Sequence, residues 1–121
     1  MPDPTAPLPL KAEDFHILLA LEDAHRHGYA ILKAIEDTTA GRVRMAPSPF
    51  YRKLKRLADD GLLAEADERP APELDDDRRR YYRLTPWGRE VLQAEALRLV
   101  ELAGHPRVVE LARGGRSGGS G

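Results

Sequence analysis

The amino-acid sequence predicts a mainly α-helical domain with a small β-hairpin, an α+β fold, followed by one long helix. Two observations predict this fold. Apolar residues recur every three or four positions in four segments, and two short segments of alternating polarity flank a loop that contains two prolines. With 121 residues, of which 41% are hydrophobic and 32% charged, the chain is long enough for one domain with one modest core.

The N-terminal half is expected to contain two helices. Residues 1–10 include four prolines and are predicted to form a flexible arm. Helical spacing of apolar residues predicts a first helix over residues 11–24 and a second over residues 29–39, with a break at residues 25–28. Residues 42–45 alternate between charged and apolar side chains, so we expect a short strand there.

A third helix is predicted over residues 49–60, because Ser48 is a good N-cap and Pro49 suits the first helical position. Its apolar stripe is expected to consist of Tyr51, Leu54, Leu57 and Ala58. Four basic side chains fall largely on the opposite side, namely Arg52, Lys53, Lys55 and Arg56.

The C-terminal half is expected to form the hairpin and the long helix. Strands are predicted over residues 62–67 and 79–84, with a loop over residues 68–77. Thr85 and Pro86 again combine a cap with a proline, so a helix should follow to about Ala103. The predicted organisation is a flexible arm (1–10), a domain (11–85), a C-terminal dimerisation helix (86–112) and a disordered Gly/Ser tail (113–121).

Composition excludes several classes of protein. Cysteine is absent, which excludes disulfides and thiolate metal sites and is typical of a reducing cytosol. The four histidines are scattered without carboxylate partners, and His27 beside Gly28 is expected to be structural, so we predict no metal and no cofactor. No nucleotide-binding or catalytic motif and no apolar run of about 18 residues is present, so an enzyme or a membrane protein is not expected.

The formal net charge of −1 conceals three charged blocks. Residues 42–60 contain six basic and two acidic side chains, and residues 78–89 contain five arginines and no acid. Between them, residues 61–77 contain seven acidic side chains and one arginine. One such block would be ordinary solvated surface. Two basic blocks on adjacent elements favour a polyanionic partner, because local charge governs such association better than total charge.

The predicted order of elements is that of a helix-turn-helix followed by a two-stranded wing. The major groove of duplex DNA admits one helix, and the duplex is a dense polyanion. The third helix has the apolar stripe and the cationic outer face that this partner requires, and its free N–H groups can meet a phosphate. We therefore predict double-stranded DNA as the partner, with the wing arginines at a flanking backbone or minor groove.

Five segments together form a recognisable pattern: Phe15–Leu21, His27–Ile31, Phe50–Leu57, Gly61–Leu62, and Arg79–Thr85 with Gly88. With this pattern the chain resembles the PadR family of winged-helix transcriptional regulators over roughly residues 13–103, and its single C-terminal helix resembles the smaller subfamily. The resemblance implies that the last helix makes a homodimer, that the third helix enters the major groove, that the wing touches the DNA backbone, and that binding represses transcription.

Two features depart from the family pattern. The family usually has Gly-Thr-Leu-Tyr at the start of the third helix, where this chain has Ser48-Pro49-Phe50-Tyr51. Pro49 therefore stands in place of the threonine, whose hydroxyl can hold a phosphate. The hydroxyl of Ser48 is the substitute. The second departure is the acidic wing, Asp75 to Asp77, which would repel phosphate if it faced DNA. Three consecutive acids also resemble a cation site, although such runs are more often simply solvated.

The predicted DNA-binding residues are Ser48, Tyr51, Arg52, Lys53, Lys55, Arg56, Arg78, Arg79 and Arg80. Tyr51 has two interpretations, a phosphate contact through its hydroxyl or a core ring with the hydroxyl at the rim. Tyr82 is expected in the core, and Tyr81 and Arg83 on the opposite face of the strand suit either role.

The long helix carries apolar residues on more than one side, which so small a domain cannot bury alone. A two-fold partner would bury them and place two recognition helices about one DNA turn apart, which predicts a pseudo-palindromic operator. The predicted dimerisation residues are Val91, Leu92, Ala96, Leu99, Val100 and Leu102. Because the family can bind planar effectors at its dimer centre, a small planar hydrophobic effector would meet Trp87, Leu92, Ala96 and Leu99, with plain dimer packing as the alternative.

We therefore predict a cytoplasmic, homodimeric, sequence-specific DNA-binding regulator. The alternative is a winged-helix module that binds another protein through the acidic wing and has no specific affinity for DNA. DNA binding that is weak and insensitive to salt would favour this alternative, because contacts with phosphates weaken steeply as salt rises.

Overall fold

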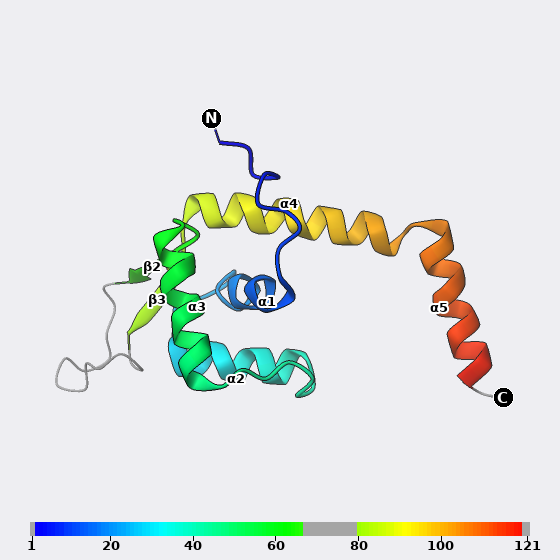
Figure 1. Cartoon of the computed structure of the whole chain (residues 1–121), viewed down its shortest axis with the longest axis horizontal. Helices are drawn as coiled ribbons and strands as arrows, with labels where there is room; N and C mark the ends of the chain where they lie inside the picture. Colours follow the sequence, from blue (N-terminus) through cyan, green and yellow to red (C-terminus); the bar gives the residue numbers. More distant parts are fainter. Residues whose placement is uncertain (1, 67–79, 120–121) are drawn as a thin grey trace.

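The computed structural model describes residues 2–66 and 80–119, which form helices and a small three-stranded sheet. The elements are α1 (Ala12–Ala20), β1 (Arg26–His27), α2 (Gly28–Thr38), α3 (Pro47–Asp59), β2 (Leu63–Ala66), β3 (Tyr81–Leu84), α4 (Pro86–Ala103) and α5 (Pro106–Gly119). In Figure 1, α1 lies between α4 and α2, while α3 and the strands stand at one end of the molecule and α5 at the other. The predicted α+β fold class is confirmed.

The sheet has the order β1-β3-β2, with both pairs antiparallel. In the hairpin, Leu63 lies opposite Leu84 and Ala66 lies opposite Tyr81. Tyr82 is buried, as expected for a core residue, whereas Tyr81 and Arg83 are half-buried on the other face.

The strand predicted at residues 42–45 is wrong, and the third strand is β1, where the sequence indicated only a break between helices. Residues 42–45 follow Ala40 and Gly41, which both have positive φ, and the Val43 N–H bonds to the Thr39 hydroxyl rather than to a strand. The two residues of β1 instead pair with the free edge of β3. A strand this short shows no periodicity in a sequence.

The hydrophobic core lies where α1, α2, α3 and α4 meet. Its fully shielded side chains include Ile17, Leu18, Ile31, Phe50 and Val91. Burying a side chain of this size contributes roughly 1.5–3 kcal/mol. Because α3 supplies three buried residues to this cluster, its orientation on the domain is set by the core.

Helix α3 begins two residues earlier than predicted. Pro47 occupies its first turn and Ala46 is the N-cap, which makes no side-chain capping bond. Ser48 is therefore an exposed residue of the first turn and not the cap. The sequence predicts Ser48 as the cap and Pro49 as the first helical residue. The helix starts at Pro47 instead, because this proline also has the fixed φ that suits a helix start.

The start of α4 is held by a cap and by a close backbone approach. The Thr85 hydroxyl accepts a hydrogen bond from Gly88 N (2.9 Å) and donates one to the carbonyl oxygen of Gly61 (2.6 Å). A Cβ on Gly88 would lie 1.8 Å from the carbonyl oxygen of Leu62, so only glycine fits this contact. The predicted Thr85–Pro86 start is confirmed, and it ties α4 to the end of α3.

The N-terminal segment, predicted as a flexible arm over residues 1–10, contacts the domain through its last residues. Leu8 and Leu10 pack against the core, and the Leu10 N–H bonds to a carboxylate oxygen of Glu95 at 2.9 Å. Figure 1 shows this segment crossing α4 before it enters α1. The first helix also ends at Ala20 and not at Ala24, because the chain turns there toward β1.

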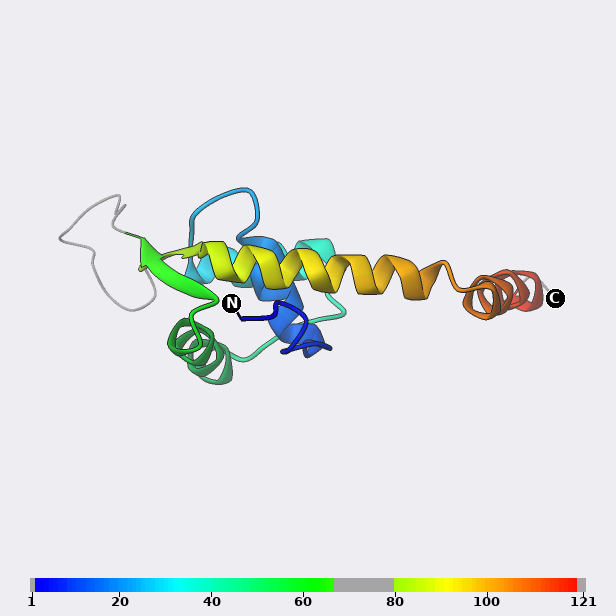
Figure 2. The ribbon, with the colours of Figure 1, turned by 90° about the horizontal axis from the view of Figure 1, so that it is seen from above.

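The long helix predicted over residues 86–112 is interrupted at residues 104–105. A separate helix, α5, spans Pro106–Gly119 and thus extends into the segment predicted as a Gly/Ser tail. His105 starts it, since its Nδ1 accepts the Arg107 N–H at 3.1 Å, and Pro106 follows at the first helical position. In Figure 2, α4 extends beyond the domain and α5 lies at its far end. Among the described helices, none is long and apolar enough to cross a membrane.

Candidate nucleic-acid interface

Helix α3 has one face in the core and the opposite face in solvent. Phe50, Leu54 and Leu57 are buried, whereas Arg52 and Lys55 are exposed. Within residues 2–66 and 80–119, no ion pair engages either of these two side chains. The predicted division of the helix into an apolar and a basic side is therefore present, with Phe50 as a core residue that the predicted stripe omitted.

Tyr51 lies at the boundary between the two faces of α3. It is half-buried, its ring is edge-on to Phe50 with centroids 5.1 Å apart, and its Cε1 would be 2.7 Å from a Cβ on Gly28. The absence of a Cβ at Gly28 therefore leaves room for the Tyr51 ring against the start of α2. The ring has a packing role, and a phosphate contact through its hydroxyl stays a prediction.

The start of α2 is capped by a histidine. The His27 Nδ1 accepts the Ala30 N–H at 3.1 Å, and the ring stacks on Tyr29 and meets the edge of Tyr81. These contacts join α2 to β3 and are consistent with the structural role expected for His27. Among the described residues, no cluster of potential metal ligands is present.

Two of the predicted DNA-binding residues are held by a carboxylate on α1. Lys53 Nζ lies 3.2 Å from Asp14 Oδ1 and 3.5 Å from Glu13 Oε1, and Arg56 Nη2 lies 3.7 Å from Asp14 Oδ2. Asp14 is buried, and it is not among the residues predicted from the sequence. The available signal was an acidic residue in the first turn of α1, which was indistinguishable from an ordinary favourable interaction with the helix dipole.

Of the three wing arginines predicted to bind DNA, Arg80 lies in the described part of the chain. Arg80 Nη1 lies 2.8 Å from Glu65 Oε1 in a pair that is about half-exposed on both sides and joins β2 to the start of β3. Arg78 and Arg79, together with Asp75, Asp76 and Asp77, lie outside the described residues.

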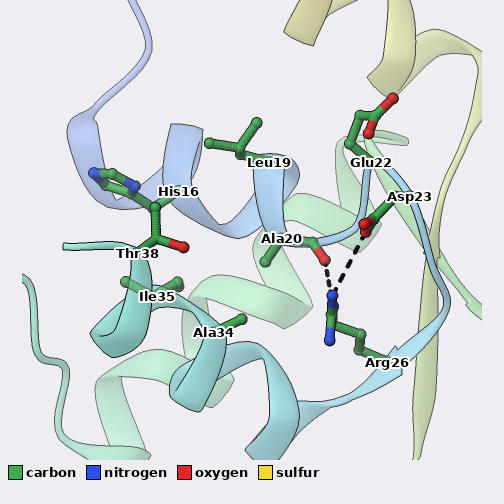
Figure 3. A pocket seen from close by; sticks show the side chains of 9 residues that line it. All are labelled: His16, Leu19, Ala20, Glu22, Asp23, Arg26, Ala34, Ile35 and Thr38. Carbon is green, nitrogen blue, oxygen red and sulfur yellow. Dashed lines mark hydrogen bonds and ion pairs between the residues drawn. The ribbon is translucent and has the colours of Figure 1, made fainter. Parts of the chain in front are cut away.

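A cavity of about 270 Å³ lies between α1 and α2 (Figure 3). Arg26 crosses one side of it, where its Nε donates to the carbonyl oxygen of Ala20 at 2.7 Å and its Nη2 lies 3.5 Å from Asp23 Oδ1. These interactions stabilise the turn between α1 and β1. The cavity is lined by residues of α1, of α2 and of that turn, so it is separate from the basic face of α3.

The predicted dimerisation residues divide into two groups. Val91 and Leu92 are buried in the core of the chain, so they are not accessible to a partner. Ala96, Val100 and Leu102 are exposed and Leu99 is half-buried, because the second half of α4 extends past the domain. The structure adds Leu97, which is 59% exposed, and Leu111 of α5, which is 71% exposed.

The predicted effector-binding residues do not form one open site within the chain. Trp87 packs partly against the core, Leu92 lies inside it, and Ala96 and Leu99 lie further along α4. The core covers Leu92 and part of Trp87, so these two residues are not open to solvent together with Ala96 and Leu99.

Glu95 is the second buried carboxylate, and it ties α4 to the N-terminal arm. It accepts hydrogen bonds from Arg98 Nε, from Arg98 Nη2 at 3.0 Å and from Leu10 N at 2.9 Å. The hydrogen bond from Arg98 is the main reason that the pKa of Glu95 is lowered, and burial opposes this shift. Glu95 is not among the residues predicted from the sequence, because a glutamate in a charged helix is most often exposed.

This arrangement of α2, α3 and a β2–β3 hairpin defines a winged helix-turn-helix protein. Residues 17–94 match the Transcriptional regulator PadR-like family, and the chain belongs to that family of transcription regulators, which is not a family of enzymes. The family resemblance that the sequence indicated is therefore confirmed.

One relative by sequence is an uncharacterized 37.1 kDa protein in transposon Tn4556 of Streptomyces fradiae. It is 40% identical over 96 residues, which are 79% of this chain and 25% of that protein. The chain thus spans about a quarter of the length of this relative.

Solved structures with the same fold include two regulators. RosR of H. salinarum has a TM-score of 0.62 at 22% identity over 94% of this chain and 96% of that one. PadR of Bacillus subtilis, in complex with operator DNA, has a TM-score of 0.60 at 23% identity over 71% of this chain and 47% of that one. At this level of identity the likeness shows the fold.

Proposed function

We propose that this chain is a homodimeric, sequence-specific DNA-binding transcriptional repressor that acts in the cytoplasm. The observation that carries the proposal is the exposed basic face of α3, whose opposite face is anchored in the core. Such a helix can enter a major groove as a rigid unit. Membership of a family of transcription regulators supports the same conclusion.

In this proposal, α3 enters the major groove and presents Arg52, Lys55 and Arg56. Arginine suits this role because its planar guanidinium can donate two hydrogen bonds to one guanine or one phosphate. Ser48 would meet a phosphate through its hydroxyl and its backbone N–H, which is the N–H of the first turn that remains between Pro47 and Pro49. Arg78, Arg79 and Arg80 would contact the backbone that flanks the groove.

The second copy would cover the overhanging part of α4. Leu97 and Val100 are more than half-exposed, although aliphatic side chains of this size are usually buried. A two-fold partner would bury them and present two copies of α3 to one face of DNA, so we expect a pseudo-palindromic operator. The seam around Ala96 and Leu99 is where a small planar apolar effector would bind, and its binding would release the DNA.

Fluorescence anisotropy would test the proposal with labelled DNA from upstream of the gene for this protein and a scrambled duplex as control. We expect tight binding that prefers the upstream DNA and weakens steeply between low and near-physiological salt. Arg52→Ala should weaken it, whereas Arg107→Ala, which removes an exposed arginine of α5, should not. Equal, weak and salt-insensitive binding to both duplexes would instead favour the protein-binding module.

A further inference from the structure

We propose that Asp14 is a positioning residue for DNA recognition: it withdraws Lys53 from the DNA-facing surface and orients Arg56 within it. This inference rests on the proposed DNA-binding function and revises the set of residues that perform it. The carboxylate belongs to α1, outside the helix-turn-helix formed by α2 and α3.

The geometry makes Asp14 a bridge between two basic residues one helical turn apart. Its Oδ1 lies 3.2 Å from Lys53 Nζ, and its Oδ2 lies 3.7 Å from Arg56 Nη2. The side chain of Asp14 is only 8% exposed, so both attractions act in a region of reduced dielectric, where they are stronger than at an open surface. Each oxygen of the carboxylate is directed to a different cation.

Lys53 and Arg56 differ in what this bridge leaves free. The side chain of Lys53 is 18% exposed, and its single ammonium group is also within 3.5 Å of Glu13. A phosphate would have to compete with two carboxylates for that group. The side chain of Arg56 is 56% exposed, and a guanidinium carries five N–H donors, so one pair with Asp14 leaves donors for DNA.

The consequence is a smaller but better ordered contact surface. Lys53 is neutralised inside the protein, whereas Arg56 is held in one orientation before DNA arrives. Asp14 thereby limits sequence-independent attraction to phosphates, which depends on the number of free cations. It also favours directional contacts to base edges, which depend on the orientation of the guanidinium.

The first test uses Asp14→Asn and the matched variant Glu13→Gln, which removes the same charge from the neighbouring, half-exposed carboxylate. Limited acetylation followed by mass spectrometry reports the reactivity of each lysine without DNA. In the wild type, Lys53 should react several-fold more slowly than the exposed Lys55. Asp14→Asn should bring the two rates together and Glu13→Gln should change them less, whereas equal rates in the wild type would overturn the proposed pairing.

The second test measures DNA binding by the same proteins across a salt series. Asp14→Asn should raise affinity for the scrambled duplex several-fold, steepen the logarithmic salt dependence by about one unit, and reduce the preference for the operator. Glu13→Gln should have a smaller effect on all three. If the wild type binds the operator but the two variants behave alike, this inference fails alone. If the wild type binds no DNA, the proposed function itself fails.

A third variant keeps the inference testable if Asp14→Asn does not fold. Lys53→Gln leaves Asp14 paired with Arg56 and should change operator affinity less than twofold. Arg52→Gln removes a cation that is already exposed and should reduce affinity at least tenfold more than Lys53→Gln does. Equal losses for the two variants would show that Lys53 contacts DNA and would overturn the inference.

Discussion

Helices α3 and α4 pack against the same core but leave different surfaces exposed. Helix α3 has a buried residue in each turn after the first and exposes arginine and lysine. In α4, burial is limited to positions 88–95, and Leu97, Val100 and Leu102 remain exposed beyond them. Figures 1 and 2 show the two helices at different places in the fold, with α3 at one end and α4 extending toward the other.

The difference indicates two kinds of partner. An exposed basic face is well solvated in water and attracts a polyanion. An exposed apolar face is unfavourable in water, and covering it with another apolar surface lowers the free energy. The exposed surface of α3 is the one proposed for DNA, and the exposed surface of α4 is the one proposed for a second copy of the chain.

Gly88→Ala should displace α4 from the core. The added Cβ would collide with the backbone carbonyl of Leu62, which cannot move as a side chain can. We expect a loss of roughly 3 kcal/mol in the free energy of unfolding, measured by urea denaturation. Gly104→Ala is the matched control, because its Cβ would find no contact shorter than 3.4 Å. Equal stability of both variants would contradict this account of how α4 is anchored.

Leu97→Glu should separate the dimer without unfolding the protomer. Leu97 is 59% exposed, so a charge there is tolerated in one chain but would be buried unpaired in a dimer. We expect the dimer to weaken by roughly 2 kcal/mol at each copy of the site, as measured by sedimentation or light scattering across a concentration series. Ala24→Glu adds the same charge in an exposed loop and should leave the mass unchanged. A wild-type monomer at all concentrations would refute the assignment of the α4 surface.

Arg56→Ala should weaken operator binding by about 1–2 kcal/mol while leaving the dimer intact. The expected loss follows from the exposed part of the guanidinium, which Asp14 does not occupy. Anisotropy titration gives the affinity, and light scattering on the same sample gives the mass. Unchanged affinity would remove Arg56 from the DNA-binding set.

Glu95→Gln should lower stability by roughly 1 kcal/mol at neutral pH, because a neutral amide loses the charge-assisted hydrogen bonds from Arg98. The pKa of Glu95 is lowered in the folded state, so its contribution is present above the ordinary value of 4.5 and is lost as pH falls through the lower folded-state pKa. The variant should therefore show a weaker loss of stability in acid than the wild type. Glu101→Gln on the exposed side of α4 is the control, and parallel pH profiles for the wild type and Glu95→Gln would contradict the prediction.

Local signals in the sequence were sufficient for the features that depend on near neighbours along the chain. The alternation of apolar and basic residues in α3 and the cap at Thr85 both act within one or two turns. The start of α5 also has a local signal, since His105 caps the helix that Pro106 begins. The glycines and serines that follow predict a tail instead, because such composition is typical of flexible segments.

Tertiary structure alone decided the pairings between residues that are distant in the sequence. The sequence determined an amphipathic, basic third helix, a hairpin and a long helix with excess apolar surface, because side-chain periodicity and capping are local. It did not determine that Asp14 meets Lys53 across 39 positions or that Glu95 meets Leu10 across 85. A buried carboxylate and a solvated one look alike in a sequence. The difference between them arises only when packing removes water and places a cation or an N–H within reach.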